Sequence, residues 1–248
     1  MQKILIAGLA MQLAGCTAAT MEGFEKIAAQ DGVARIDISA VPTWMNGSFR
    51  VGDSLGKVRR IASSDAIGWG PEGIGSNFDL VQDGYAARFG RMAFEISRAD
   101  LGGRAEARCA YSREEERVAV GRVTLARPSA PLRVTCQYRI DGREAGTLDL
   151  LAHPYDRASY ANGRKGEITI FGTSLALQTR HGIAEADVGV ADASGYVMLG
   201  SNGQPVGALE LTGGTSRRAV LPNNEAQRKA AVLAAVTLAL FWDPGDVG

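Results

Sequence analysis

The sequence predicts a mainly β protein, an antiparallel barrel or sandwich of about a dozen strands with one buried apolar C-terminal α-helix. From residue 34 onward, short runs of alternating apolar and polar residues are separated by turn residues, at the spacing expected of a sandwich or barrel. Residues 230–242 are apolar on every side of a helix except at Thr237, so the helix must be buried on all sides. At ~1.5 Å per residue the helix spans only ~20 Å. It is therefore too short to cross a bilayer core, which needs ~20 apolar residues.

Length and composition indicate a globular chain with one large domain. The 248 residues are 46% hydrophobic and can bury a sizeable core. The 27 basic and 27 acidic side chains balance, with no basic run, so no nucleic-acid partner is expected. We divide the chain into a signal peptide (1–15), a tether (16–33) and a single β-rich domain (34–248) that includes the terminal helix (224–242).

The N-terminus has the features of an exported bacterial protein. Lys3 precedes an uncharged, mostly apolar stretch that closes with Leu13-Ala14-Gly15-Cys16, as in a secretory signal peptide. This ending resembles the lipobox of bacterial lipoproteins. The resemblance implies a diacylglycerol thioether on Cys16, cleavage before it and acylation of the new N-terminus, with palmitate as a typical chain.

Lipidation at Cys16 would determine where the protein resides. Each buried CH₂ contributes about 0.8 kcal/mol, so several acyl chains make the anchor effectively permanent. Position 17 is Thr rather than Asp, which in the enterobacterial sorting pattern favours the outer membrane. We therefore expect a cell-envelope protein that faces the periplasm, with the outer membrane favoured over the inner one.

Residues 132–140 form the clearest predicted strand, and residues 104–111 repeat its pattern. The inward positions of these two segments are Leu132, Val134, Cys136, Tyr138 and Ile140, and Ala105, Ala107, Cys109 and Tyr111. Asp141-Gly142 predicts a hairpin after the first segment. The other expected strands are 49–51, 58–62, 85–89, 92–97, 118–126, 147–151, 167–171, 174–179, 186–190, 196–199, 206–211 and 219–221.

Turn signals complete the expected architecture. Asn202-Gly203 predicts a second hairpin, and the Gly-rich residues 68–75 predict a long loop or a boundary between sub-domains. Three consecutive glutamates, residues 114–116, predict the solvated tip of a hairpin.

The terminal helix has its own boundary signals. Asn224 is the expected N-cap, and Gln227 follows three residues later, close to a capping box. Asp243-Pro244 is the expected end, because the residue before a proline avoids the α region.

About a dozen strands would enclose a space too wide for side chains alone, and a buried helix could fill it. The succession of Gly195-Tyr196-Val197-Met198, Asn202-Gly203, Val206-Gly207-Ala208-Leu209 and the apolar helix resembles the C-terminal end of tubby-like barrels, which include scramblases and the LURP-one proteins. The resemblance implies the fold only, because no basic pair here matches the phosphoinositide site of the tubby branch. The alternative is an ordinary β-sandwich with the helix on one face.

Cys109 and Cys136 are candidates for a disulfide in an oxidising compartment. If residues 104–111, 118–126 and 132–140 formed a meander, the two cysteines would lie two strand spacings apart, ~9–10 Å. A disulfide needs Cα atoms within ~7 Å. The bond therefore requires their strands to be neighbours, and two small buried hydrophobes are the alternative.

No motif in the sequence identifies a cofactor, a metal or a catalytic group. The glycines of residues 68–73 match a dinucleotide-binding pattern only formally, because no βαβ unit surrounds them. His153 and His181 are far apart, without a metal-ligand motif. His153 with Asp156 as orienter could serve a Ser–His hydrolase, but no nucleophile elbow is present.

The candidate contact residues are Trp69 in the Gly-rich stretch and the pairs Arg59-Arg60 and Arg217-Arg218, which face lipid headgroups or water. We expect a membrane-anchored envelope lipoprotein with a non-enzymatic binding or scaffolding role, whose partners are the membrane and another envelope protein or lipid. The alternatives are a carrier or sensor of a lipid or other apolar ligand, which needs an unfilled cavity, and a periplasmic hydrolase, which needs a cleft around a histidine.

Overall fold

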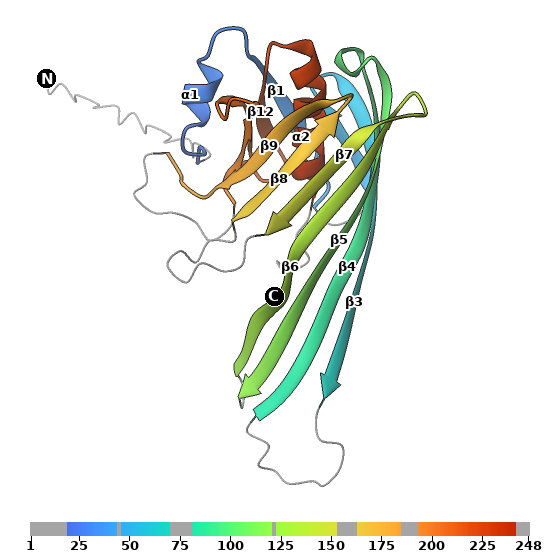
Figure 1. The fold of residues 1–248 in the computed structure, drawn as a ribbon, viewed down its shortest axis with the longest axis vertical. Helices are drawn as coiled ribbons and strands as arrows, with labels where there is room; N and C mark the ends of the chain where they lie inside the picture. Colours follow the sequence, from blue (N-terminus) through green and yellow to red (C-terminus); the bar gives the residue numbers. More distant parts are fainter. Residues whose placement is uncertain are drawn as a thin grey trace, which may run out of the picture.

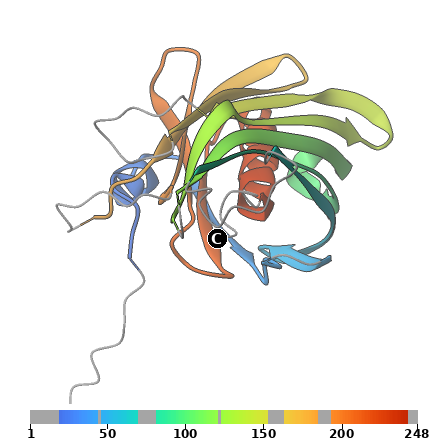
Figure 2. The same cartoon turned by 90° about the horizontal axis from the view of Figure 1, so that it is seen from below.

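Twelve strands form a closed antiparallel barrel around the C-terminal helix. The structure is a computed structural model that describes residues 19–43, 46–69, 81–120, 123–152, 163–184 and 193–241. Each strand pairs with two neighbours, in the order β1-β12-β11-β10-β9-β8-β7-β6-β5-β4-β3-β2 and back to β1. Seen from below, the helix α2 (Glu225–Leu240) lies inside the ring of strands (Figure 2). The predicted mainly β class is confirmed, and closure of the sheet decides for a barrel.

The elements follow one another in a simple order along the chain (Figure 1). The strands are β1 (Ala34–Ser39), β2 (Gly47–Val51), β3 (Ser54–Trp69), β4 (Val81–Arg98), β5 (Gly103–Val120), β6 (Val123–Ile140), β7 (Arg143–Ala152), β8 (Arg164–Ile170), β9 (Thr173–Arg180), β10 (Gly195–Leu199), β11 (Pro205–Glu210) and β12 (Arg217–Leu221). A short helix, α1 (Phe24–Ala28), precedes them, and a 3₁₀ turn, η1 (Ala99–Leu101), joins β4 to β5.

Strands β3 to β6 are 16 to 18 residues long and extend well beyond α2 in Figure 1. The predicted division of these strands into shorter ones is therefore wrong. Residues 85–89 and 92–97 belong to one strand, β4. Residues 118–126 are not a separate strand, because they contain the end of β5 and the start of β6. Residues 114–116 lie within β5 rather than at a hairpin tip.

Two predicted hairpins are present, with different turns. Asp141 and Gly142 alone connect β6 to β7, both with positive φ (47° and 77°), as the tight turn between two twisted strands requires. The connection from β10 to β11 is longer than the expected two residues, because Gly200 donates its N–H to the carbonyl of Gln204 around Asn202.

Helix α2 fills the barrel. Every residue from Ala230 to Leu240 is buried, with Leu233, Val236 and Leu240 at 0% exposure. The opposite side of the helix is equally covered, since Ala235 is 0% and Leu238 3% exposed. The predicted burial on all sides is confirmed, and the small alanines leave room for the surrounding strands.

The two ends of α2 are satisfied in different ways. The side chain of Asn224 accepts a hydrogen bond from the N–H of Gln227, so the predicted N-cap is confirmed. At the other end the helix stops at Leu240, earlier than predicted. The guanidinium of Arg60 donates to the carbonyl of Leu240 (2.6 Å), which places a cation at the negative end of the helix dipole. Phe241 then takes an extended conformation and packs edge-on against Tyr111 (5.6 Å).

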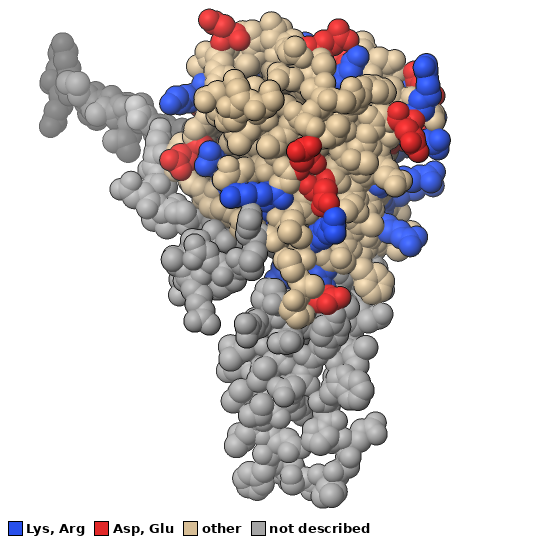
Figure 3. Space-filling model, in the orientation of Figure 1, with Lys and Arg blue, Asp and Glu red and all other residues tan. Residues whose placement is uncertain are grey.

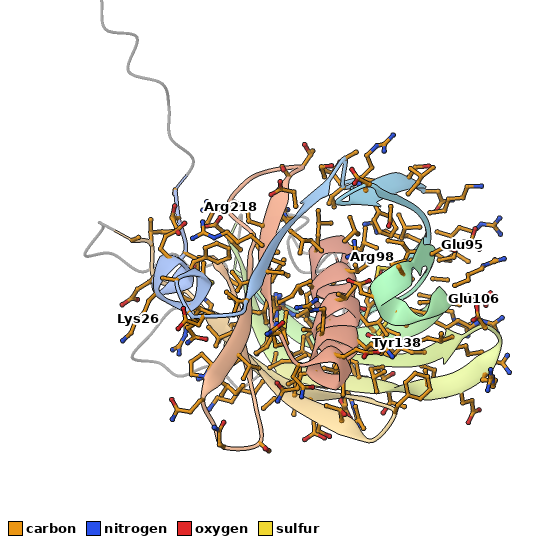
Figure 4. All side chains as sticks on the ribbon, turned by 90° about the horizontal axis from the view of Figure 1, so that it is seen from above. Lys26, Glu95, Arg98, Glu106, Tyr138 and Arg218 are labelled. Atoms are coloured by element: carbon orange, nitrogen blue, oxygen red, sulfur yellow. A yellow bond between two sulfur atoms is a disulfide. The ribbon has the colours of Figure 1, made fainter. Side chains whose placement is uncertain are left out.

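The one polar residue in the apolar helix has a partner in the barrel wall. The hydroxyls of Thr237 and Tyr138 lie 2.7 Å apart, and both side chains are buried. Figure 4 shows Tyr138 directed at the helix. Burial raises the pKa of Tyr138. The hydrogen bond therefore satisfies two polar groups that would otherwise be costly inside the barrel.

Cys109 and Cys136 occupy opposed positions on the adjacent strands β5 and β6. Their Cα atoms are 4.0 Å apart, and a disulfide joins them. The bond is formed because the two strands are neighbours, rather than being separated by the middle strand of the expected meander.

The N-terminal segment is packed onto the barrel from its first described residues, although a tether was expected there. Phe24, Ile27 and Met21 are buried against Val197, Ala208 and Val220, on the outer face of β10 to β12. Met21 also passes over Gly195, where a Cβ would collide with its sulfur. Residues 20–28 are thus a fixed part of the domain.

Candidate functional site

Arg59 and Arg60 are adjacent in β3, so they point to opposite faces of the sheet. Arg60 is half-buried and bonds to the end of α2, as described above. Burial lowers the pKa of its guanidinium. Arg59 is exposed on the outer face. Of this predicted contact pair, only Arg59 faces outward.

The second predicted pair is committed to contacts within the molecule. Arg217 is half-buried and donates to the carbonyl of Leu211 (2.7 Å), and burial lowers its pKa. Arg218 donates to the buried carboxylate of Glu210 (2.5 Å) and lies 4.9 Å from the ring centre of Phe24. The hydrogen bond to Glu210 raises the pKa of Arg218. Arg218 helps to attach the N-terminal segment to the barrel, and Arg217 fixes the loop that follows β11.

Several predicted residues fall outside the described part of the chain. Cys16, His153 and Asp156 are among them. Trp69 is the last residue of β3, and the structure describes its backbone but not its side chain. His181 is described and half-buried just after β9.

The strand register brings three exposed arginines together on the outer face of β3, β4 and β5. Arg59 of β3 and Arg108 of β5 both oppose Ala93 of β4. Arg91 lies two residues further along β4, on the same face. At ~4.8 Å per strand and ~3.4 Å per residue, neighbouring Cα atoms of this arginine triad are about 8 to 10 Å apart. The small side chain of Ala93 leaves open space between them.

None of the three arginines has an ion pair or hydrogen bond to any described residue. The nearby carboxylates are engaged by another residue. Arg104 forms ion pairs with Glu95 and with Glu106 (3.5 Å for the latter). The positive charges of Arg59, Arg91 and Arg108 are therefore available to a ligand. Figure 3 shows both basic and acidic side chains along the margin of the molecule formed by these strands.

Three shallow hollows meet on this face, and Arg108 lines all of them. One, of ≈ 290 Å³, lies over Ala93 between Arg59 and Arg108. The second, of ≈ 500 Å³, extends from Arg91 across β5 to β7. The third, of ≈ 290 Å³, continues toward Glu144 at the β6–β7 hairpin. Together they form a trough that crosses β3 to β7.

The floor of the trough beyond the arginines has hydrogen-bonding side chains beside apolar surface. Its side chains include Thr135 and Gln137 of β6 and Thr147 and Asp149 of β7. Asp149 is held by a bidentate ion pair with Arg133, with contacts of 3.2 and 2.6 Å. The trough thus combines free cations with hydroxyl, amide and carboxylate groups.

The arginine triad and the N-terminal segment lie on opposite walls of the barrel. In the ring of strands, β5 is six positions from β11, onto which α1 packs, and β3 is four positions from it. Figure 4 shows the same arrangement, with Lys26 and Arg218 at one side of the ring and Glu95 and Glu106 at the other.

Sequence reasoning identified Arg59 but not Arg91 or Arg108 as a contact residue. The alternation of residues 104–111 already placed Arg108 outward. The missing information was the register, since Arg59 and Arg108 are far apart in the chain and meet only through β4.

No known protein family, curated protein or solved structure matches this chain. Within the described ranges, no helix is long and apolar enough to cross a membrane, and no three His, Cys, Asp or Glu residues are grouped to hold a metal ion.

Proposed function

We propose that the protein is a lipid-anchored component of the bacterial cell envelope, facing the periplasm, with a non-enzymatic binding or scaffolding role. The observation that carries the binding role is the contrast between a filled interior and an open outer wall. The interior is occupied by α2, whose core residues are fully buried. The outer wall of β3 to β5 carries arginines whose charge no described residue neutralises.

Two features support export and anchoring. The motif Leu13-Ala14-Gly15-Cys16 resembles a lipobox. The disulfide between Cys109 and Cys136 is the kind of bond that persists in an oxidising compartment. The position of Thr17 after the cysteine favours the outer membrane.

A closed barrel around a C-terminal helix is also the fold that the resemblance to tubby-like barrels implies. The carrier and hydrolase alternatives have less support. A carrier of apolar ligands needs free interior volume, which α2 occupies. Ser174, which lies near His181 in the sequence, bonds instead to Glu167 and Thr169 on the surface.

The anchor is tested by replacing Cys16 in the full chain expressed in a bacterial host. The wild-type protein is expected to incorporate labelled palmitate and to lose residues 1–15, as mass spectrometry of the mature N-terminus would show. Cys16→Ser should remain an unlabelled precursor, whereas Thr17→Ser, which leaves the motif intact, should behave like the wild type. Labelling and normal cleavage of Cys16→Ser would show that the anchor is assigned wrongly.

A further inference from the structure

We propose that the arginine triad (Arg59, Arg91 and Arg108) and the hydrogen-bonding side chains beside it bind an acidic glycan on a wall of the barrel that the N-terminal segment leaves uncovered. This inference specifies the partner of the binding role proposed above and rests on that role.

The triad provides the charge recognition. A guanidinium has five N–H donors in a planar fork that matches a carboxylate with two parallel hydrogen bonds. Arg59 and Arg108 border the hollow over Ala93, and Arg91 and Arg108 border the next one. Successive acidic groups of one extended chain can therefore contact successive arginines. Lys57 adds a further cation at the rim of the first hollow.

The floor of the larger hollow provides the groups that a sugar needs. Sugar hydroxyls both donate and accept hydrogen bonds. Gln137 does both through its amide, Thr135 and Thr147 do both through their hydroxyls, and Asp149 accepts. A polypeptide ligand would instead be expected to seek apolar pockets for its side chains. Gln137, Thr135, Thr147 and Asp149 line this hollow beside its apolar part, and these hydrogen-bonding groups favour a glycan.

The place of the N-terminal segment excludes the headgroups of the anchoring membrane as the ligand. Only five residue steps separate Cys16 from Met21, which is fully buried on the β10–β12 wall. They reach at most about 18 Å. Counted around the ring from β11 at ~4.8 Å per strand, Arg108 of β5 is six strands away, about 29 Å, and Arg59 of β3 is four strands away, about 19 Å. The acyl chains at Cys16 therefore hold Arg108 well away from the anchoring membrane, so the three arginines cannot all contact its headgroups at once.

The test uses the mature, lipidated full chain in neutral detergent and measures its affinity by titration calorimetry. The probes are polygalacturonate, an acidic glycan; dextran, a neutral glycan; and polyglutamate, an acidic chain without sugars. Polygalacturonate is expected to bind most tightly, with an affinity that falls as salt is added. Equal binding of dextran would overturn the role of the arginines, and equal binding of polyglutamate would overturn the choice of a glycan.

Matched variants locate the site. Arg108→Gln is expected to weaken polygalacturonate binding about tenfold, because it lines every hollow and donates charge-assisted hydrogen bonds. Arg91→Gln and Arg59→Gln should each weaken it severalfold. Gln137→Leu should reduce the preference for polygalacturonate over polyglutamate.

Arg143→Gln is the control, since Arg143 is exposed and lies outside the trough. An equal loss in this variant would mean that only net charge matters and would overturn the site. Palmitate labelling of Cys16 reports on the anchor separately, so the two proposals fail independently.

Discussion

Two walls of the same barrel use arginine in opposite ways. On the β10–β12 wall, Arg218 bonds to Glu210, approaches Glu25 (3.4 Å) and covers the ring of Phe24. On the β3–β5 wall, Arg59 and Arg108 are exposed and contact no described carboxylate. The first wall is covered by the chain's own N-terminal segment, and the second is left to solvent.

The difference shows that an arginine pair in the sequence does not by itself indicate a binding surface. Fixing an arginine side chain costs up to about 2 kcal/mol of conformational entropy, which Glu210 and Phe24 offset at Arg218. The arginine triad has no such partners. A ligand that orders the triad must supply contacts of the kind that Glu25 and Phe24 of the N-terminal segment supply to Arg218 on the other wall.

The largest expected effect is on the covered wall. Phe24 is 1% exposed in the small core between α1 and the barrel, so Phe24→Ala should weaken docking of the segment by about 3 kcal/mol. The result would appear as faster hydrogen exchange at the Met21 amide and a lower free energy of unfolding. Phe171→Ala is the control, because Phe171 is 58% exposed at a turn. Unchanged exchange in Phe24→Ala would mean that the segment is not held by this packing.

A smaller effect is expected at the buried carboxylate of the same wall. Glu210 is 3% exposed and accepts hydrogen bonds from the Met21 N–H (2.7 Å) and from Arg218. Glu210→Gln keeps the shape but removes the charge, and should cost about 1 to 2 kcal/mol in urea unfolding. Glu25→Gln removes the other, exposed partner of Arg218 and should change stability by less than about 0.5 kcal/mol. Similar losses in both variants would contradict a special role for Glu210.

The smallest effects separate the adjacent residues of β3. Arg60→Gln removes the guanidinium that bonds to the last carbonyl of α2 and should cost about 1 kcal/mol. Arg59→Gln should change the free energy of unfolding by less than about 0.5 kcal/mol, because Arg59 is exposed and has no described partner. Equal destabilisation by both changes, measured by urea unfolding, would show that Arg59 also has a structural role.

Local patterns predicted the strands and the buried helix but not the length of the strands. The two strands predicted at 85–89 and 92–97 are separated at Gly90. In the structure β4 continues through this glycine, and Tyr111 of the neighbouring strand fills the space above it. Pro128 and Pro131 lie between the predicted strands 118–126 and 132–140, yet both belong to β6. Among the described residues the register with β7 begins at Arg133, so on that side neither proline interrupts a ladder of described hydrogen bonds.

The candidate site was predictable only in part, for the same reason. Alternation within one strand indicates which side chains face outward, as it did for Arg108. It carries no information about which residue of the next strand lies alongside. The disulfide shows this as well, because an incorrect meander placed Cys109 and Cys136 too far apart, whereas the register opposes them directly.

The amino-acid sequence alone determined that residues 230–240 are enclosed and that strands of alternating apolar and polar residues enclose them. Both features follow from local composition and from the period of the apolar residues, which decide which surfaces are buried. Closure of the sheet, the covering of one wall by the N-terminal segment and the meeting of Arg59, Arg91 and Arg108 were decided by the tertiary structure. These features depend on strand register and long-range pairing, which the free energy of the whole barrel selects and no local pattern encodes.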